Sequence, residues 1–258
     1  MLPSLFISHG SPMLPLTEAP ARAFLAGLGV SLDRPRAILV ASAHWETERP
    51  TVNAVARNDT IHDFYGFPPA LYRLSYPAPG NPALAGRIGD LLGAAGLAGD
   101  IDHARGLDHG AWMPLLLAYP GADIPVVQLS VQTPLGPAHH VRLGQALAPL
   151  RAEGVLVIGS GSWTHDLRRF RGQAIDAPEA PDVVAFSNWM DSALAEGRRD
   201  DLIAYRTKAP FGAQQHPTEE HLLPLFVAMG AGGEGARPRR IHQSASYGVL
   251  RMDAYAFV

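Results

Sequence analysis

The 258-residue chain contains no cysteine. Disulfide bonds, thiolate zinc sites, iron–sulfur clusters and a cysteine nucleophile are therefore all excluded. Any metal ion that the protein binds must be held by histidine, aspartate or glutamate side chains.

Long hydrophobic runs are missing as well. The N-terminal sequence MLPSLFISHGSP has no basic region, and its apolar stretch is too short for export or for spanning a bilayer. We expect a cytoplasmic protein with no membrane partner.

The chain also carries little charge. Only 17% of the residues are charged and the formal net charge is -3, with no run of lysine or arginine. This balance gives no electrostatic reason to expect nucleic acid as a partner.

Several catalytic motifs are absent too. There is no HExxH, no P-loop and no complete dinucleotide fingerprint, and Gly159–Ser162 (GSGS) does not satisfy GxSxG.

What the sequence does contain is an alternation of short apolar runs and helical patterns. Hydrophobic residues make up 47% of the chain. Continuous apolar runs that suit strands covered on both faces occur at residues 5–7, 37–42, 124–130 and 155–158. Helical patterns occur at residues 21–28, 83–95, 139–151 and 180–196. The alternation predicts a single α/β domain over residues 1–258, with a central mostly parallel or mixed sheet flanked by helices on both sides.

Three segments interrupt this rhythm. Residues 56–80 are rich in proline, glycine and aromatic residues, and are long enough to indicate a functional loop. Residues 230–240 (GAGGEGARPRR) predict a flexible loop, and the alternation in residues 244–257 predicts a strand or hairpin at a sheet edge. The oligomeric state is not readable from the sequence.

Three of the eleven histidines share one context. His9, His44 and His165 each follow a predicted strand. Ligands of open α/β sheets bind beyond the carboxyl ends of the parallel strands, so three such strands would direct the three imidazoles into one crevice. A single histidine in this position is more often only hydrogen-bonded, but three together indicate a shared site.

His221 is a fourth candidate. It lies in PTEEH, which predicts a helix start with Thr218 as the N-cap and His221 in the first turn. In the alternative interpretation His221 is an ordinary polar residue, and Glu219 and Glu220 only complement the helix dipole. Imidazole ligands with open coordination positions suit zinc, or Fe(II) that binds both substrate and oxygen.

Two further histidines occur in sequences that favour function. His109 stands beside Asp108 in a short loop before a helix, and imidazole as a chemical group can give or take a proton near neutrality. His62 lies in the aromatic loop and is a candidate for lining a planar substrate's pocket, with a solvated turn as the alternative. The histidines assigned to the surface are His103, His139, His140 and His242.

Eight segments of the chain together resemble one enzyme family. In order, they are FISHGSPM, SAHWET, IHDFYGFP, LYRLSYPAPGNPALA, GLDHGAWMPL, ADIPVVQLS, IGSGSWTHDL and PTEEHLLPLFVAMGA. They resemble the DOPA-dioxygenase-type branch of the class III extradiol ring-cleaving dioxygenases, from about residue 3 to the C-terminus. The resemblance implies one non-haem metal ion and oxidative opening of a catechol ring beside its two hydroxyl groups.

The resemblance also implies roles for individual residues. His9, His44 and His221 correspond to metal ligands, and His165 to a further ligand or an acid–base residue. His109 corresponds to a residue near substrate and oxygen. Protocatechuate-cleaving members of the superfamily have a glutamate as third ligand, where this chain offers His221. An all-histidine site has less negative charge, so a bound metal would be more Lewis acidic and zinc is a candidate beside iron.

The leading hypothesis is a dioxygenase that uses one Fe(II) per chain, with Zn(II) as the other candidate metal. Its partners are O2 and a small aromatic diol, either DOPA-like or protocatechuate-like. His165 would remove a phenolic proton and His109 would act on the oxygen. His62, Phe64 and Trp112 would bind the ring, and Tyr65 and Phe67 would hold it with them. Residues 56–80 and 205–216 together would shape the pocket. The alternatives are a zinc-dependent hydrolase on the same scaffold and a non-catalytic metal-binding protein.

Overall fold

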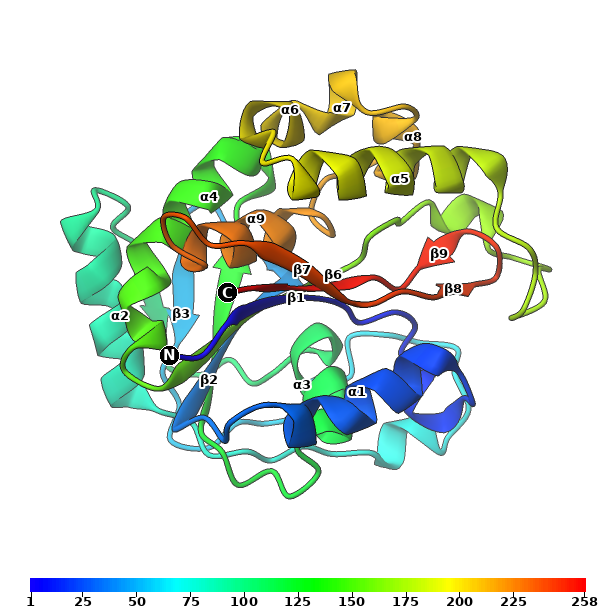
Figure 1. The fold of residues 1–258 in the computed structure, drawn as a ribbon. Helices are drawn as coiled ribbons and strands as arrows, with labels where there is room; N and C mark the ends of the chain where they lie inside the picture. The colour runs from blue at the N-terminus through cyan, green and yellow to red at the C-terminus, as the bar shows by residue number, and fades with distance from the viewer.

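A computed structural model describes residues 1–258, and it contains one mixed sheet between two layers of helices (Figure 1). The sheet strands are β1 (Ser4–Ser8), β2 (Ala37–Glu46), β3 (Thr51–Asn53), β4 (Asp100–Asp102), β5 (Val126–Val131), β6 (Val155–Gly161), β7 (Pro238–His242) and β10 (Ala254–Phe257). A separate hairpin is formed by β8 (Ala245–Ser246) and β9 (Leu250–Arg251). The helices are α1 (Pro20–Ser31), α2 (Pro82–Ala94), α3 (His109–Ala118), α4 (Gly136–Leu147), α5 (Pro181–Ala195), α6 (Arg199–Ile203), α7 (Tyr205–Lys208), α8 (Gly212–Gln215) and α9 (Leu223–Ala231).

The centre of the sheet is parallel. Its strand order is β4-β3-β5-β2-β6-β1-β10-β7, and β5, β2, β6 and β1 run in the same direction. β10 is antiparallel to β1, and β3 is antiparallel to β5, which makes the sheet mixed. The predicted fold class is therefore confirmed. Because four neighbouring strands are parallel, their carboxyl ends meet at one edge of the sheet.

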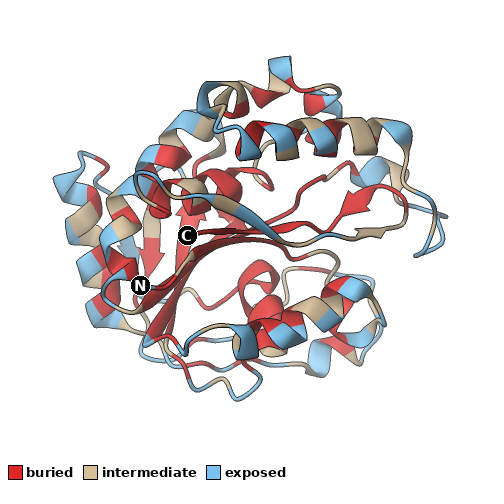
Figure 2. Ribbon diagram, in the orientation of Figure 1, coloured by how far each residue is buried: buried red, intermediate tan, exposed pale blue.

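Both faces of the sheet are covered, which explains the continuous apolar runs (Figure 2). In β1, Leu5 and Ile7 belong to the hydrophobic cluster on the side of α1 and α3. The residue between them, Phe6, belongs to the cluster on the side of α5 and α9. Successive side chains of a strand point to opposite faces, so a strand with a helix layer on each side needs apolar residues at every position.

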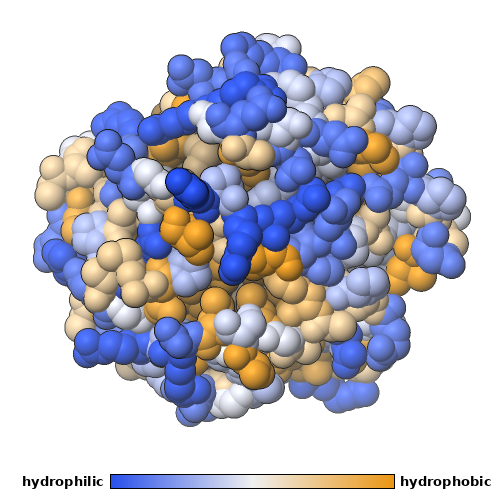
Figure 3. Space-filling model, viewed as in Figure 1, coloured by the Kyte–Doolittle hydropathy of each residue, from blue (hydrophilic) through white to orange (hydrophobic).

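The C-terminal part of the chain differs from the prediction in two places. β7 begins at Pro238, inside the segment that was expected to be a flexible loop. β10 is not at the sheet edge, because β7 pairs outside it. Hydrophilic groups lie over β7 at the centre of the face in Figure 3, where Arg239 and Arg240 are exposed. Proline and charged side chains on an edge strand discourage pairing with another chain.

None of the helices is of the length and hydrophobicity that crossing a membrane requires.

The expectation that His140 lies at the surface is wrong, since its side chain is fully buried in α4. Nδ1 donates a hydrogen bond to the Gly136 carbonyl, and Nε2 accepts one from the Gln132 backbone N–H at 3.0 Å. Because the Gln132 N–H donates to Nε2, a proton on Nε2 would break this hydrogen bond. Burial, the main cause, lowers the pKa of His140 to about 3.

We expect His140 to make the fold acid-sensitive. Because its pKa is about 3 in the folded state and about 6.5 in an unfolded chain, its stabilisation is complete above pH 6.5 and is lost as the pH falls toward 3. His140→Gln keeps an acceptor but does not titrate. Between pH 6 and 4.5 its free energy of unfolding should fall less steeply than that of the parent, by about 1.4 kcal/mol per pH unit. Urea unfolding at the two pH values measures the difference, and equal slopes would contradict it.

Candidate metal centre

Five histidines from distant parts of the chain line one cavity of about 240 Å³ at the carboxyl edge of the parallel strands. They are the five that the sequence singled out, namely His9, His44, His109, His165 and His221. His9 directly follows β1, and His44 lies near the end of β2. The pairing of β2 with β5 shifts register between Ala41 and Glu46, and such an irregularity redirects a side chain at a strand end.

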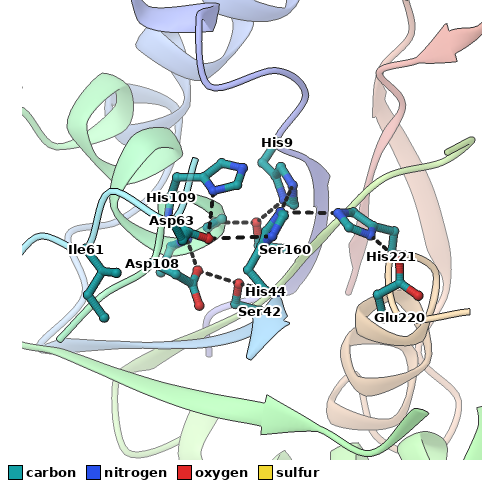
Figure 4. Close-up of polar contacts among 12 residues, drawn as sticks. His9, Ser42, His44, Ile61, Asp63, Asp108, His109, Ser160, Glu220 and His221 are labelled. Atoms are coloured by element: carbon teal, nitrogen blue, oxygen red, sulfur yellow. Dashed lines mark hydrogen bonds and ion pairs between the residues drawn. The ribbon is translucent and has the colours of Figure 1, made fainter. Parts of the chain in front are cut away.

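The imidazoles of His9, His44 and His221 point toward one another (Figure 4). Nε2 of His44 lies 3.1 Å from Nε2 of His9 and 3.2 Å from Nε2 of His221. His9 and His221 are buried, and His44 is partly exposed at the cavity. These three side chains form a group whose nitrogen atoms lie within reach of one cation.

Each of the three imidazoles has an outer partner for its other nitrogen. Nδ1 of His9 lies 3.0 Å from the Ser160 hydroxyl, which donates its own proton to the Gly110 carbonyl. Nδ1 of His221 lies 2.9 Å from Glu220, and Nδ1 of His44 lies 3.6 Å from Asp63. The Ser160 hydroxyl gives its own proton to Gly110 and so accepts from His9, and an ionised carboxylate accepts from His221, so both rings carry their proton on Nδ1. The 3.6 Å contact of His44 with Asp63 is longer than a hydrogen bond, but the negative charge favours the proton on Nδ1 there as well. The Nε2 lone pairs of His9 and His221 are therefore both directed at Nε2 of His44.

This arrangement fits a metal ion. Lone pairs that face each other across about 3 Å with no proton between them repel, and a shared cation removes the repulsion. Metal–imidazole bonds of about 2.1 Å place the nitrogens of neighbouring ligands roughly 3.0–3.4 Å apart. The observed separations of 3.1 and 3.2 Å lie in that interval.

Electrostatics point the same way. Burial, followed by the neighbouring imidazoles, lowers the pKa of His9 and of His221 well below the ordinary value. Burial and then His109 lower the pKa of His44 to about 3. The three rings are thus neutral near pH 7, and neutral imidazole is the form that binds a metal.

The remaining two histidines lie beside this group. His109 is the first residue of α3, and its Nδ1 is 2.9 Å from Asp63. His165 follows β6 and stacks on His221, with ring centroids 3.4 Å apart and planes at 15°. Burial, the main cause, lowers the pKa of His165 to about 4. Both residues face the cavity outside the group of three nitrogens. Each also shares a smaller group that could hold a cation with one of the three, His109 with His44 and Asp63, and His165 with His221 and Glu220.

The helix that follows His221 begins later than predicted. α9 starts at Leu223, with Pro224 in its first turn, so His221 lies in the preceding turn and not in the helix. Thr218 does not cap the helix, since its hydroxyl contacts Glu220. The His221 carbonyl accepts a hydrogen bond from the Ser162 backbone N–H at 2.8 Å, which ties the turn to the end of β6.

Gly161 makes this close approach possible. A methyl group on Gly161 would overlap the backbone carbonyl oxygen of His221. We expect Gly161→Ala to displace the turn, weaken Zn(II) binding by about tenfold or more and destabilise the fold by about 1–3 kcal/mol. Chelator competition and thermal unfolding measure the two effects. Gly86→Ala is the control, because space around Gly86 in α2 is open. Unchanged zinc affinity in Gly161→Ala would show that the close packing does not position His221.

Of the residues predicted to bind the substrate ring, only Phe67 lines the cavity. Trp112 is fully buried in the core, and its indole N–H donates to the Ile61 carbonyl. His62 is bonded to the Leu74 carbonyl, and Phe64 packs behind His109. The exposed side chain of Tyr65 does not line the cavity either. The residues that form the apolar wall are Phe67, Leu167, Phe170 and Leu250.

Only Phe67 of this wall comes from residues 56–80, and residues 205–216 contribute nothing to it. Sequence reasoning also missed Asp63 and Ser160 as partners of the histidines, and it assigned Glu220 only to a helix dipole. The one local signal is that a carboxylate adjoins a histidine in His62-Asp63 and Glu220-His221.

Comparison with known proteins agrees with the sequence motifs. Residues 4–257 match the family model described as the catalytic LigB subunit of aromatic ring-opening dioxygenase. The chain is 49% identical to the 4,5-DOPA dioxygenase extradiol of Beta vulgaris, over 98% of this chain and 96% of the relative. It is 41% identical to a protein of the same name from Escherichia coli, over 89% and 85% of the two chains. A crystal structure of an uncharacterized protein from Escherichia coli K12 superposes with a TM-score of 0.83 at 33% identity, covering 100% of both chains.

Proposed function

The chain belongs to the family of the catalytic LigB subunit of aromatic ring-opening dioxygenases, and from this premise we propose that His9, His44 and His221 hold one Fe(II) ion for extradiol cleavage of a DOPA-like catechol. The protein is a metal-dependent, extradiol ring-cleaving dioxygenase whose substrates are O2 and a small aromatic diol. The convergence of three Nε2 atoms carries the proposal for the ligands. When bound, the metal would supply a Lewis acid for the catechol oxygens and for O2. Fe(II) is proposed over Zn(II) because zinc has no redox chemistry with which to activate oxygen.

His165 is the proposed base. It lines the cavity beside His221, where an imidazole nitrogen can take the proton of a catechol hydroxyl. Burial keeps the ring neutral near pH 7, and a base must be unprotonated to act. The stacking of His165 on His221 favours this role over a further ligand, because the ring lies parallel to a ligand and outside the convergent group.

His109 is the proposed acid–base residue on the oxygen side. Asp63 accepts hydrogen bonds from its backbone N–H and from Nδ1, each at 2.9 Å, so Nε2 is the free nitrogen of the ring. This fixes which atom can give or take a proton in the cavity. The ring centroid lies 3.9 Å from that of His44, so a proton at Nε2 is delivered next to the proposed ligands.

The cavity wall supports a DOPA-like over a protocatechuate-like substrate. The wall residues Phe67, Leu167, Phe170 and Leu250 are apolar. No arginine, lysine, aspartate or glutamate side chain lines the cavity. The two arginines that follow Leu167 are each paired, Arg168 with Asp166 and Arg169 with Asp182. A carboxylate attached directly to the ring would be buried without a partner, which is costly. The charged groups of DOPA sit at the end of a flexible chain and can reach solvent.

Anaerobic reconstitution with Fe(II), followed by a panel of catechols, tests the proposal. We expect oxygen uptake and a yellow ring-opened product with L-DOPA and with 4-methylcatechol. For protocatechuate we expect kcat/KM to be lower by about a hundredfold or more, because an unpaired buried charge costs several kcal/mol. Oxygen uptake with none of the three would contradict the function, and a preference for protocatechuate would contradict the substrate assignment. Turnover with Zn(II) but not Fe(II) would overturn the choice of metal.

A further inference from the structure

Two carboxylates stand outside the ring of histidines, and each lies against two imidazoles. Asp63 contacts His44 and His109, and Glu220 contacts His221 and His165. In both cases one imidazole belongs to the convergent group of three and the other does not. The carboxylates come from unrelated parts of the fold, Asp63 from the long loop before α2 and Glu220 from the turn before α9.

The two carboxylates favour opposite members of their pairs. The Asp63 carboxylate is 2.9 Å from Nδ1 of His109 but 3.6 Å from Nδ1 of His44. The Glu220 carboxylate is 2.9 Å from Nδ1 of His221 but 3.9 Å from Nδ1 of His165. Asp63 thus bonds to the imidazole outside the convergent group, and Glu220 bonds to the imidazole within it.

We propose that Asp63 and Glu220 are positioning residues with divided roles, Asp63 orienting His109 for turnover and Glu220 orienting His221 for metal retention. The turnover role rests on the proposed function. The metal-retention role rests on the geometry of His221 alone. Hydrogen bonds to the outer nitrogen of a ligand imidazole fix its tautomer and its ring orientation, and removing them typically weakens metal binding or activity 10–100-fold.

The hydrogen bonds of Asp63 make its substitution informative. Its two carboxylate oxygens each accept one hydrogen bond from His109, Oδ1 from the backbone N–H and Oδ2 from Nδ1. An asparagine amide has one acceptor oxygen and one donor nitrogen, so Asp63→Asn can satisfy only one of these bonds. The Nδ1–H tautomer of His109 then loses its support, while the longer contact to His44 contributes little in either protein.

Glu220 differs in this respect, which gives a rescue. A single oxygen, Oε1, accepts from Nδ1 of His221 at 2.9 Å and from the Thr218 hydroxyl at 3.1 Å. The amide oxygen of Glu220→Gln can keep both contacts, whereas Glu220→Ala keeps neither. We therefore expect Glu220→Ala to weaken Zn(II) binding by about 10–100-fold and Glu220→Gln to restore most of the loss. Turnover of metal-saturated Glu220→Ala should change much less.

For Asp63→Asn the pattern should reverse. At saturating Fe(II) its kcat should fall by about 10–100-fold with little change in KM, and its Zn(II) affinity should stay within about threefold of the parent. The ¹⁵N shifts of His109 in the diamagnetic zinc-loaded protein should change from the Nδ1–H tautomer to a mixture. The matched controls are Asp59→Asn in the same loop and Glu219→Ala beside Glu220, and both should behave like the parent.

Zinc affinity by chelator competition, His109 ¹⁵N shifts and the kcat–KM split together test the division. Loss of zinc affinity in Asp63→Asn equal to that in Glu220→Ala would overturn it, as would parental affinity in Glu220→Ala or an unchanged His109 tautomer in Asp63→Asn. If the parent consumes no oxygen with any catechol, the proposed function fails. The zinc affinities and the ¹⁵N shifts would still decide whether each carboxylate positions its imidazole.

Discussion

Replacing His44 by alanine should abolish stoichiometric metal binding and, with it, ring cleavage. Nε2 of His44 is the common neighbour of the other two, at 3.1 Å from His9 and 3.2 Å from His221. Its removal leaves two imidazoles, and we expect Zn(II) affinity to fall by about two to three orders of magnitude. Chelator competition on the apo protein and metal analysis after gel filtration measure this. His9→Ala should behave in the same way.

The fold should survive the His44 substitution. His44 lies near the end of β2 and its side chain is 23% exposed at the cavity, so alanine leaves no sealed void. The thermal unfolding midpoint of the apo protein should stay within about 5 °C of the parent. His103→Ala removes an exposed histidine and should retain metal and activity. If His44→Ala or His9→Ala kept one equivalent of metal as tightly as the parent, the proposed ligand set would be wrong.

Replacing His109 by alanine should give the opposite combination, a metal-loaded protein that turns over slowly. His109 is outside the convergent group, and its Nδ1 is occupied by Asp63, so the metal content should match that of the parent. Loss of a positioned acid–base residue should lower kcat by about 10²–10⁴-fold. Oxygen uptake with saturating L-DOPA, normalised to bound iron, measures the effect.

Substrate affinity separates this effect from damage to the cavity. The apolar wall lies on other elements, so anaerobic binding of L-DOPA to zinc-loaded His109→Ala should change little. His109→Gln keeps a polar side chain but cannot transfer a proton as imidazole does, and it should be nearly as slow. Parental kcat in either variant would remove His109 from the mechanism. Loss of metal in both would instead place it among the ligands.

Much of the fold was predictable because the central strands are buried on both faces. That burial requires uninterrupted apolar residues, and it made β1, β2, β5 and β6 visible as short hydrophobic runs. His9, His44 and His165 were found for the same reason, since each follows such a run. His109 and His221 needed sequence context of a different kind, a neighbouring carboxylate and glycine in one case and an apparent helix start in the other.

The parts that the sequence did not reveal depend on contacts between distant residues. Asp63 reaches His109 across 46 positions, and nothing near Asp63 in the sequence indicates that partner. Trp112 was a candidate for the pocket because it is aromatic and follows His109 closely, but α3 directs its side chain into the hydrophobic core. Leu167, Phe170 and Leu250 form the wall only because the hairpin of β8 and β9 meets the segment after β6. β7 was missed because its arginines and proline give an exposed edge strand no apolar signal.

The negative charges near the site lie on residues that are not proposed as metal ligands. Its three proposed ligands are neutral, and two carboxylates lie just outside them, Glu220 hydrogen-bonded to Nδ1 of His221 and Asp63 3.6 Å from Nδ1 of His44. A hydrogen bond from His109, working against burial, lowers the pKa of Asp63, which keeps this carboxylate ionised. The two negative charges compensate part of a cation's charge while the cation keeps its Lewis acidity.

The most direct test is a crystal structure of the metal-loaded protein with anomalous diffraction recorded at the absorption edge of the bound metal. We predict one anomalous peak per chain, within about 2.0–2.2 Å of Nε2 of His9, His44 and His221. A peak at another place, or three imidazoles that share no common centre in the loaded protein, would contradict the proposed site.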